Sequence, residues 1–443
     1  MLFQIIYYLS ILIFSFVLLG YAIKTIMFIL SVIWIVHEKK IINRSIDFYP
    51  KVSMLIPAFN EEQTIIENIT HVINNEYSDL EIIVVNDGST DQTLSLLINA
   101  FELSEKQSLK TDDAIPVQPV RRVFKSSTIK NLIVIDKKNG GKADALNCAI
   151  NASTAEYILC LDADTVLTRN TIKYLIRPMM QNNDIVITSG NVRILATKMH
   201  DDLFCKLQRV EFLGSISLFR TGWNFLNANI IVSGALGLFK KKTVTDVGGY
   251  HNLAIGEDIE LTIRIHRKLL EQKCNYKVLQ LALPTCFTRA VPSVKEMIKQ
   301  RKRWQKGLIS SLRINRELLG NPRYKQVGLA ALPFYTIFEI WGPFIEVIGI
   351  VCLIVMSFFS LELFSPLIIW GLSFLLGVTD NFVALTIDKF LLRGMKWKDY
   401  FALCSASLTC AFFYHFIQLY CKVKGAMEFF LETHVSTVWD TKR

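Results

Sequence analysis

The sequence lacks any spacing that would join its cysteines to one another or to a metal ion. Its nine cysteines show no Cys-x-x-Cys pair and no histidine partners at metal-site intervals, which argues against a structural zinc centre. We therefore expect all nine to be reduced thiols, mostly buried as small apolar side chains. The chain also has no internal repeat and no low-complexity segment, which excludes a repeat array.

Charged residues are scarce in two long stretches, residues 2–36 and about 329–421. The first exceeds the ~20 residues that a spanning helix needs, and we expect one long, tilted transmembrane helix over 1–36 rather than a tight hairpin. It has no basic leading segment and is too long for a cleaved signal peptide. The second stretch, within a C-terminal region at 329–443, predicts about three spans, near 336–359, 364–387 and 399–421.

Basic residues flank these apolar stretches. The chain has 49 Lys and Arg against 39 Asp and Glu, a formal net charge of +10. Residues 37–44, "HEKKIINR", follow the first stretch directly, and basic residues at a membrane exit favour the cytoplasmic side. We therefore expect a multi-pass protein of the cell (plasma) membrane with a cytoplasmic soluble domain, its surplus charge facing anionic lipid rather than nucleic acid. Residues 329–340 leave an alternative, a helix that lies in the interface or re-enters the bilayer.

Residues 45–290 have the mixed polarity of a soluble domain. Apolar strands that alternate with segments of helical spacing predict an α/β fold, with a mostly parallel sheet and helices on both faces. Residues 102–130 are polar and contain proline, so they predict a surface loop. Residues 230–244 predict two strands joined by a turn. The four clearest strands are expected at 52–56, 82–85, 131–136 and 157–161.

All four strands end in polar side chains, among them Glu61, Asp87, Asp136 and Asp162. The carboxyl ends of parallel strands share one edge of a sheet, and ligands bind at that edge. The sequence therefore predicts that polar groups far apart in the chain are gathered in one place.

Asp162 and Asp164 follow the last of these strands, with one residue between them. Two carboxylates at an exposed edge need a counter-charge, and Mg²⁺ typically binds one or two carboxylates together with substrate phosphates. The pair therefore indicates a diphosphate held through a metal ion. The alternative is an Asp-rich turn whose side chains satisfy their own backbone.

Three further charged residues stand at turns and helix starts. Lys142 follows a glycine pair where a helix begins, a place where backbone N–H groups bind anions, although the Walker A spacing is absent. Asp87 can accept hydrogen bonds from a base or ribose, whereas a calcium loop fails because Ile98 stands where the bidentate Glu belongs. Asp258, in "GED" at the head of a helix, is a candidate general base or an acid favoured by the helix dipole alone.

Residues 291–328 are strongly basic and predict an amphipathic helix or helix pair on the membrane surface. Within them, "QRKRW" carries Arg301 and Arg303, whose planar forks can neutralise a diphosphate, and Trp304, whose flat face suits a sugar ring. A basic interfacial helix with a membrane-belt tryptophan is the alternative.

With D-x-D, G-E-D and Q-x-x-R-W in that order, and with "LIPAFNEE", "VVNDGSTD" and "GGKADALN" ahead of them, the chain resembles the processive family 2 glycosyltransferases. These include cellulose, hyaluronan and chitin-oligosaccharide synthases. The overall sequence pattern is most similar to that of the poly-β-1,6-N-acetylglucosamine synthases. The resemblance is strong over about residues 50–310. It implies a GT-A glycosyltransferase domain flanked by transmembrane α-helices.

The resemblance also implies roles for residues on the donor side. Glu61 and Asp87 match positions that hold the uridine. Lys142 and Asp162 match positions near the diphosphate. Asp162 and Asp164 match the pair that holds UDP through Mg²⁺ or Mn²⁺.

On the acceptor side, Asp258 matches the base that deprotonates the acceptor hydroxyl. Gln300, Arg303 and Trp304 match the motif that holds the acceptor terminus and the diphosphate. The chain departs from the pattern at residues 286–289, Cys-Phe-Thr-Arg, where many relatives have Cys-Trp-Thr-Glu. A cation thus replaces a carboxylate near the acceptor path.

The implied activity is that of a membrane-embedded, inverting, processive β-glycosyltransferase. It would polymerise a UDP-sugar, UDP-N-acetylglucosamine first, into an exopolysaccharide and help to export it. Its expected partners are the UDP-sugar donor, the growing polysaccharide acceptor and the lipid bilayer, and related systems often add a small membrane accessory subunit. Two alternatives stay open: a non-processive transferase that makes a glycolipid or lipid-linked sugar, and a catalytically silent membrane scaffold or nucleotide-sugar sensor.

Overall fold

The computed structural model of the chain describes residues 2–44, 46, 48–106, 114–162, 165–195, 202–252, 254–359 and 364–431. Asp164, one of the two residues predicted to hold a metal ion, lies outside these ranges. The other predicted site residues are all described.

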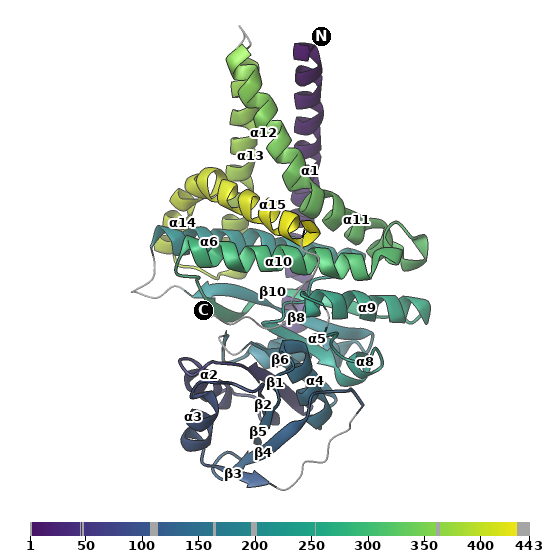
Figure 1. Ribbon diagram of the computed structural model, residues 1–443, viewed down its shortest axis with the longest axis vertical. Helices are drawn as coiled ribbons and strands as arrows, with labels where there is room; N and C mark the ends of the chain where they lie inside the picture. Colours follow the sequence, from purple (N-terminus) through teal and green to yellow (C-terminus); the bar gives the residue numbers. More distant parts are fainter. Residues whose placement is uncertain are drawn as a thin grey trace.

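The described part of residues 45–290 forms one ten-stranded sheet (Figure 1). The order of its strands is β3-β4-β5-β2-β1-β6-β9-β8-β10-β7. The four central strands β5-β2-β1-β6 are parallel, as are β8 and β10, whereas β9 lies antiparallel between β6 and β8. The strands are β1 (Val52–Ala58), β2 (Leu80–Asn86), β3 (Leu103–Lys106), β4 (Val120–Ser126), β5 (Leu132–Lys137), β6 (Tyr157–Leu161), β7 (Val166–Leu167), β8 (Ile185–Leu195), β9 (Leu236–Lys240) and β10 (Lys277–Arg289).

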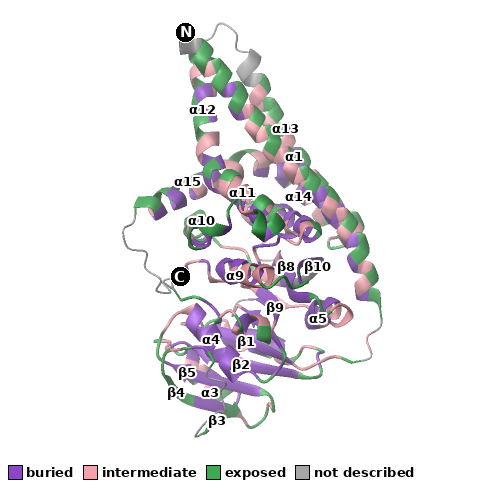
Figure 2. Ribbon diagram, turned by 90° about the vertical axis from the view of Figure 1, so that its right-hand side faces the viewer, coloured by how far each residue is buried: buried purple, intermediate pink, exposed green. Residues whose placement is uncertain are grey.

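The central strands are buried on both faces because they are mostly Val, Ile and Leu. Their side chains alternate between the two faces. Met54 and Val84 pack into one apolar core, and Leu55 and Val85 pack into the other. Figure 2 shows the central strands in the colour of buried residues. The helices of this domain are α2 (Ile65–Ile73), α3 (Thr93–Ala100), α4 (Lys142–Ala152), α5 (Thr171–Gln181), α8 (Lys241–Thr245) and α9 (Glu257–Glu271).

Two segments differ from the expectation drawn from the sequence. The surface loop predicted for 102–130 is wrong in part, because β3 and β4 form an antiparallel edge hairpin that pairs with β5. Val123 and Phe124 are buried there, but charged neighbours hide the strand pattern. The two strands predicted for 230–244 are one strand, β9, followed by α8. Before β9 the backbone closes a turn instead, with Leu236 N–H donating to Ser233 O (3.0 Å).

Within the described residues, four helical stretches are long and apolar enough to cross a membrane, by length and composition. The first lies in α1 (Leu2–Asn43), which is one continuous helix and not a hairpin. Residues 329–340 belong to the second continuous stretch, which includes η5 (Val327–Ala331), α11 (Leu332–Phe334), η6 (Tyr335–Trp341) and α12 (Gly342–Phe359). The four stretches are Gln4–Asn43, Val327–Phe358, Ile368–Leu392 and Trp397–Leu431.

The helices outside the α/β domain form two groups (Figure 1). α1, α12 and α13 extend together away from the sheet, whereas α6, α10 and α15 cross between the sheet and that bundle. The last apolar stretch therefore runs across the others for much of its length. The helices not yet bounded are α6 (Leu203–Glu211), η1 (Phe212–Leu218), α7 (Phe219–Gly222), η2 (Trp223–Leu226), α10 (Val294–Ile314), η3 (Arg316–Leu318), η4 (Pro322–Tyr324), α13 (Phe364–Ile387), η7 (Asp388–Leu392), α14 (Trp397–Thr409), η8 (Cys410–Tyr414) and α15 (His415–Leu431).

A buried carboxylate joins α1 to the sheet. Glu38 is 1% exposed and accepts hydrogen bonds from the N–H groups of Ala282 (2.9 Å) and Leu283 (3.1 Å) in β10. Backbone groups at an irregular point of a strand need such partners when they are buried. The first apolar helix is thus part of the structure that holds β10 in place.

Candidate functional site

The predicted gathering of polar side chains at one sheet edge follows from the observed strand order. β5, β2, β1 and β6 are neighbours in that order and run in the same direction. Asp136, Asp87, Glu61 and Asp162, which stand at or just past their ends, therefore occur in sequence along the edge. β9 begins beside β6, so the turn at Gly234 lies at the same edge.

Lys142 is the centre of a group that we call the open cluster, made of Lys142, Asp162 and Glu257. Its Nζ lies 2.7 Å from Asp162 Oδ1 and 3.3 Å from Glu257 Oε1. The three side chains keep 16–32% of their surface exposed. Burial acts to lower the pKa of Lys142, but the two carboxylates outweigh it and raise that pKa. The lysine therefore stays charged at a site that solvent and ligands can reach.

Asp258 lies beside the open cluster. It accepts hydrogen bonds from Gly234 N–H (3.0 Å) and Ile259 N–H (2.9 Å). A Cβ on Gly234 would lie 3.1 Å from Lys142 Nζ and 3.3 Å from Asp258 Oδ2, so a side chain there would require these groups to shift slightly. Burial, followed by the charge of Glu257, raises the pKa of Asp258 to about 6, against the opposing effect of Lys142. A carboxylate with such a pKa is suited to accept a proton near neutral pH.

Asp87 belongs to a second group, the closed cluster, made of Asp87, Lys137 and Asp144. Lys137 Nζ lies 2.7 Å from Asp87 and 2.5 Å from Asp144, and all three side chains are 0–2% exposed. Asp87 also accepts hydrogen bonds from Gly140 N–H (3.0 Å) and Gly141 N–H (2.8 Å). Burial raises the pKa of Asp87, and Lys137 opposes this. The carboxylate predicted to hold uridine thus binds the glycine turn that precedes Lys142.

Glu61 lies on the loop after β1, next to the loop after β2. Its N–H donates to Thr93 Oγ1 (2.8 Å), and its Oε2 accepts from Thr64 Oγ1 (3.0 Å). Asn60 Oδ1 accepts from Thr90 N–H (2.9 Å), which joins the two loops further. Glu61 is therefore held at the edge between the ends of β1 and β2.

The "QRKRW" segment lies on α10, and its two arginines differ. Arg303 and Trp304 are exposed. Arg301 is 7% exposed, and its Nη2 lies 2.7 Å from Glu211 Oε2. The expectation that Arg301 neutralises a diphosphate is wrong in this structure, because its charge is already paired inside the protein. Gln300 Oε1 accepts a hydrogen bond from Arg301 Nη1 (2.7 Å).

α9 and α10 touch backbone to backbone, close to the predicted base. A Cβ on Gly256 would lie 2.8 Å from Gly307 O, and Ser311 Oγ donates to Gly256 O (3.0 Å). Gly256 is two residues from Asp258, and Gly307 is three residues from Trp304. The two acceptor-side motifs are therefore held together by direct contact of their helices.

Arg220, in α7, is a further charged side chain that interacts electrostatically with Asp258, and no sequence motif marks it. Burial lowers the pKa of its guanidinium, while Tyr335, Asp258 and Glu339 act in the opposite direction. No hydrogen bond or ion pair within the described residues holds this side chain. The only sequence signal was a lone arginine in the apolar run "SISLFRTGW".

The departure at residues 286–289 lies at the end of β10. Arg289 Nη2 is 3.0 Å from Glu67 Oε2 of α2, and both side chains are more than half exposed. The cation that replaces a carboxylate is thus paired across the surface with the first helix of the α/β domain.

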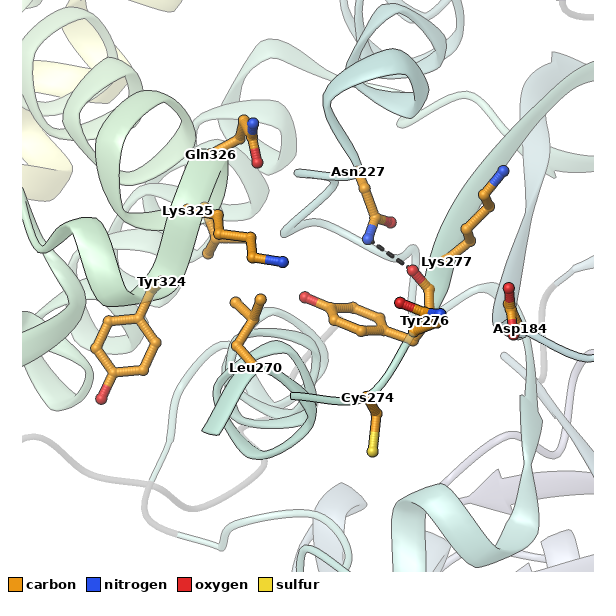
Figure 3. Close-up of a pocket in the computed structure, with 11 residues that line it drawn as sticks. Asp184, Asn227, Leu270, Cys274, Tyr276, Lys277, Tyr324, Lys325 and Gln326 are labelled. Carbon is orange, nitrogen blue, oxygen red and sulfur yellow. Dashed lines mark hydrogen bonds between the residues drawn. The ribbon is translucent and has the colours of Figure 1, made fainter. Parts of the chain in front are cut away.

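A cavity of about 200 Å³ lies away from these residues (Figure 3). It lies between the end of α9, the start of β10 and residues 324–327. Asn227 Nδ2 donates to Tyr276 O (2.8 Å) at its wall. None of the predicted site residues lines it.

The donor-side carboxylates suit a hard divalent cation in chemical type. Asp162 presents a carboxylate that is about one-third exposed at the end of β6, and oxygen ligands are those that Mg²⁺ and Mn²⁺ prefer. Among the described residues there is no group of three or more His, Cys, Asp or Glu that could hold a metal ion by themselves.

The nine cysteines are all free, and only Cys274 is exposed, as predicted.

Comparison with family models gives two matches. The model described as "Glycosyl transferase family group 2" matches residues 157–380, and that described as "Glycosyl transferase family 2" matches residues 53–110 and 111–200. The match to the family group 2 model alone covers half of the chain.

Two similar curated proteins are named poly-beta-1,6-N-acetyl-D-glucosamine synthase. The protein of Staphylococcus epidermidis is 28% identical over 256 residues, 58% of this chain and 54% of that protein. The protein of Staphylococcus aureus strain COL is 27% identical over 264 residues, 59% of this chain and 56% of that protein. The matches therefore span about half the length of these curated relatives.

Among solved structures, the mannosyltransferase PcManGT from Pyrobaculum calidifontis, in complex with GDP-Man and Mn²⁺, has a TM-score of 0.56 at 16% identity. The likeness covers 94% of this chain and 99% of that one. It confirms the predicted GT-A fold.

Proposed function

The chain belongs to glycosyl transferase family 2, and we propose that it is a membrane-embedded, inverting, processive β-glycosyltransferase that polymerises a UDP-sugar into an exopolysaccharide. UDP-N-acetylglucosamine is the first donor to test, because the curated relatives are named for its polymer. The observation that carries this proposal is the open cluster beside Asp258. A charged lysine, a carboxylate at a strand end, a carboxylate at a helix start and a carboxylate with a raised pKa meet at one accessible edge.

Donor binding is assigned to the sheet edge. The diphosphate is expected to take the place of Asp162 and Glu257 as a partner of Lys142, since a phosphate oxygen and a carboxylate oxygen make the same charge-assisted contact. Asp162, with Asp164, would hold Mg²⁺ or Mn²⁺, and such an ion neutralises charge that develops on the leaving diphosphate. Mn²⁺ is the ion bound in PcManGT.

Proton transfer is assigned to Asp258. The acceptor oxygen attacks C1 of the donor, the bond from C1 to the diphosphate oxygen breaks, and its electron pair leaves with UDP. The proton of the acceptor hydroxyl goes to Asp258. One displacement inverts an α-linked donor to a β-linked product, and it needs no covalent enzyme intermediate.

Acceptor binding is assigned to α10. Trp304 is 38% exposed and offers its ring to the terminal sugar, and Arg303 is exposed beside it. The contact of Gly256 with Gly307 holds this helix against the head of α9, so the acceptor terminus would lie within reach of Asp258. The apolar helices, together with basic residues 37–44, support a cytoplasmic catalytic domain at a membrane through which the product leaves.

The test is product formation by the purified full-length protein in detergent. Radiolabelled UDP-sugars are supplied singly, with Mg²⁺, with Mn²⁺ or with EDTA. A long, glycosidase-sensitive polymer from one donor, formed only with the metal ion, is the expected result. A single-sugar lipid product would favour the non-processive alternative, and UDP-sugar binding without turnover would favour the sensor. Repeating the assay in native membranes tests for an accessory subunit.

The matched variants are Asp258→Asn and Asp246→Asn. We expect the first to lower polymer formation roughly 10²–10⁴-fold, because proton transfer is removed. Asp246 is about half exposed and pairs only with the surface residue Lys242 among the described residues, so the second variant should retain full activity. Transfer that survives Asp258→Asn would rule out the base assignment.

A further inference from the structure

One face of the Trp304 indole is covered by another side chain. The guanidinium of Arg301 lies over the indole, with Cζ 4.0 Å from the ring centroid. The ring of Phe212 also lies near the indole, with ring centroids 6.2 Å apart. Arg301 also lies 5.5 Å from the Phe212 centroid. A cation over an indole is an attractive, geometry-dependent contact, so the position of Arg301 restricts the position of Trp304.

Arg301 is itself held by two residues from other parts of the chain. Glu211, at the end of α6, accepts from Arg301 Nη2 (2.7 Å), and both side chains are about one-tenth exposed or less. Tyr414, in η8, is 0% exposed and donates its hydroxyl to Glu211 Oε2 (2.6 Å). We call Arg301, Glu211 and Tyr414 the buried triad. It links α10 to α6 and to the last apolar stretch, which starts at Trp397.

The rest of that last stretch is also joined to α10. Glu428 lies 2.5 Å from Lys302 and 3.1 Å from Lys306. Gly425 lies so close to α10 that a Cβ there would be 3.1 Å from Lys302 O. The helix that carries the acceptor motif is therefore fixed along one side by the stretch 397–431.

A buried ion pair is a poor device for stability alone, because desolvation offsets most of the attraction between its charges. Its geometry is nevertheless strict, since a guanidinium fork binds a carboxylate in few orientations. The buried triad therefore suits a role in orientation better than a role in overall stability.

We propose that Arg301, Glu211 and Tyr414 are positioning residues that hold the indole of Trp304 at the acceptor subsite. This rests on the proposed function, because that function places the acceptor sugar on Trp304. Retention of the polymer end then depends on the stretch 397–431, because that stretch supplies Tyr414. Donor binding at the sheet edge does not depend on it.

The experiment compares Tyr414→Phe and Arg301→Lys with the control Tyr420→Phe. Tyr420, in α15, is 50% exposed, so its variant keeps the wild-type properties. Three quantities are measured on full-length protein: affinity for UDP with Mn²⁺, length of the polymer from the donor that the wild type uses, and the ¹⁹F resonance of Trp304 in 5-fluorotryptophan-labelled protein. That resonance is assigned with Trp304→Phe.

We expect Tyr414→Phe to shorten the polymer and lower its yield roughly tenfold, as for loss of a hydrogen bond to a charged group. Arg301→Lys should have a larger effect, since lysine lacks the planar fork. UDP affinity should change less than about twofold, which is a free-energy difference of well under 1 kcal/mol, and the Trp304 resonance should move in both variants.

Two results would overturn the proposal. One is an unmoved Trp304 resonance with unchanged polymer length. The other is a parallel loss of UDP affinity and polymer, which would indicate general damage to the fold. A wild-type protein that makes no polymer from any UDP-sugar would instead reject the proposed function, and the resonance comparison would still test whether the triad positions Trp304.

Discussion

The closed and open clusters each combine one lysine with two carboxylates, but in two different environments. Their lysines, Lys137 and Lys142, are five residues apart in the chain. Each has one lysine within ion-pair distance of two carboxylates. The closed cluster is 0–2% exposed and also binds the backbone of the glycine turn. The open cluster keeps 16–32% of each side chain exposed. The two clusters therefore share a charge pattern and differ in burial, and only the second presents its charges to solvent in this structure.

The two clusters also depend on each other through the turn between them. Asp87 of the closed cluster accepts from the N–H groups of Gly140 and Gly141. Gly141, with φ of 90°, precedes Lys142 at the start of α4. A left-handed φ of this kind suits glycine and strains other residues. The closed cluster therefore sets where the open cluster presents its lysine.

The largest contrast should come from replacing the lysine of the closed cluster. Lys137→Met leaves two buried carboxylates without their counter-charge, and we expect the free energy of unfolding to fall by about 3–5 kcal/mol. Little folded protein should survive detergent extraction, as measured by size-exclusion chromatography and thermal unfolding. A folded Lys137→Met protein with wild-type thermal stability would show that the closed cluster has no structural role.

The matching change in the open cluster should leave the fold intact and lower activity. For Lys142→Met we expect thermal unfolding close to that of the wild type, because the lysine is 20% exposed and its partners reach solvent. Its kcat/KM for the UDP-sugar should fall about 10²–10³-fold, as for loss of one donor to a developing charge. Equal stability losses in the two lysine variants would remove the distinction between the clusters.

The pH dependence of transfer sharpens the comparison further. A base must be deprotonated to act, and the pKa of Asp258 is raised to about 6. We therefore expect kcat/KM to be constant above this pH and to fall about tenfold per unit below it. Initial rates measured in buffers from about pH 4.5 to about pH 8 would test this. A profile that stays flat to pH 4.5 would rule out this assignment of the proton acceptor.

The smallest effect should come from removing one negative charge of the open cluster. The charge of Glu257 is the second cause of the raised pKa of Asp258, after burial. Glu257→Gln should therefore move the acid midpoint downward from about 6, towards the ordinary value of 3.8. Glu271→Gln, the same change at the far end of α9, should leave the midpoint unchanged. An upward shift in Glu257→Gln would contradict the coupling.

The sequence was sufficient for the strands that build the donor edge, and it failed where a tertiary partner decides the environment. β1, β2, β5 and β6 were predictable because continuous apolar runs mark strands buried on both faces. The edge strand β4 was not, because its buried Val123 and Phe124 stand among arginines and lysines.

The candidate site shows the same division. Strand-end carboxylates such as Asp162 were predictable, since chain direction in a parallel sheet decides where they lie. The burial of Lys137 was not, because "DKK" has the composition of a solvated segment. The pairing of Arg301 with Glu211 was equally hidden, since the two residues are 90 positions apart. Environment depends on partners that no local pattern contains.

The hydrogen bonds of Glu38 bear on how the protein can be produced. The carboxylate that satisfies two amides of β10 comes from the first apolar helix, 244 positions earlier in the chain. Removing residues 1–44 to obtain a water-soluble catalytic fragment would remove the acceptor of those two amides, at a cost of about 1–3 kcal/mol for each amide that water does not then reach. Expression strategies should therefore keep the first helix attached to the α/β domain.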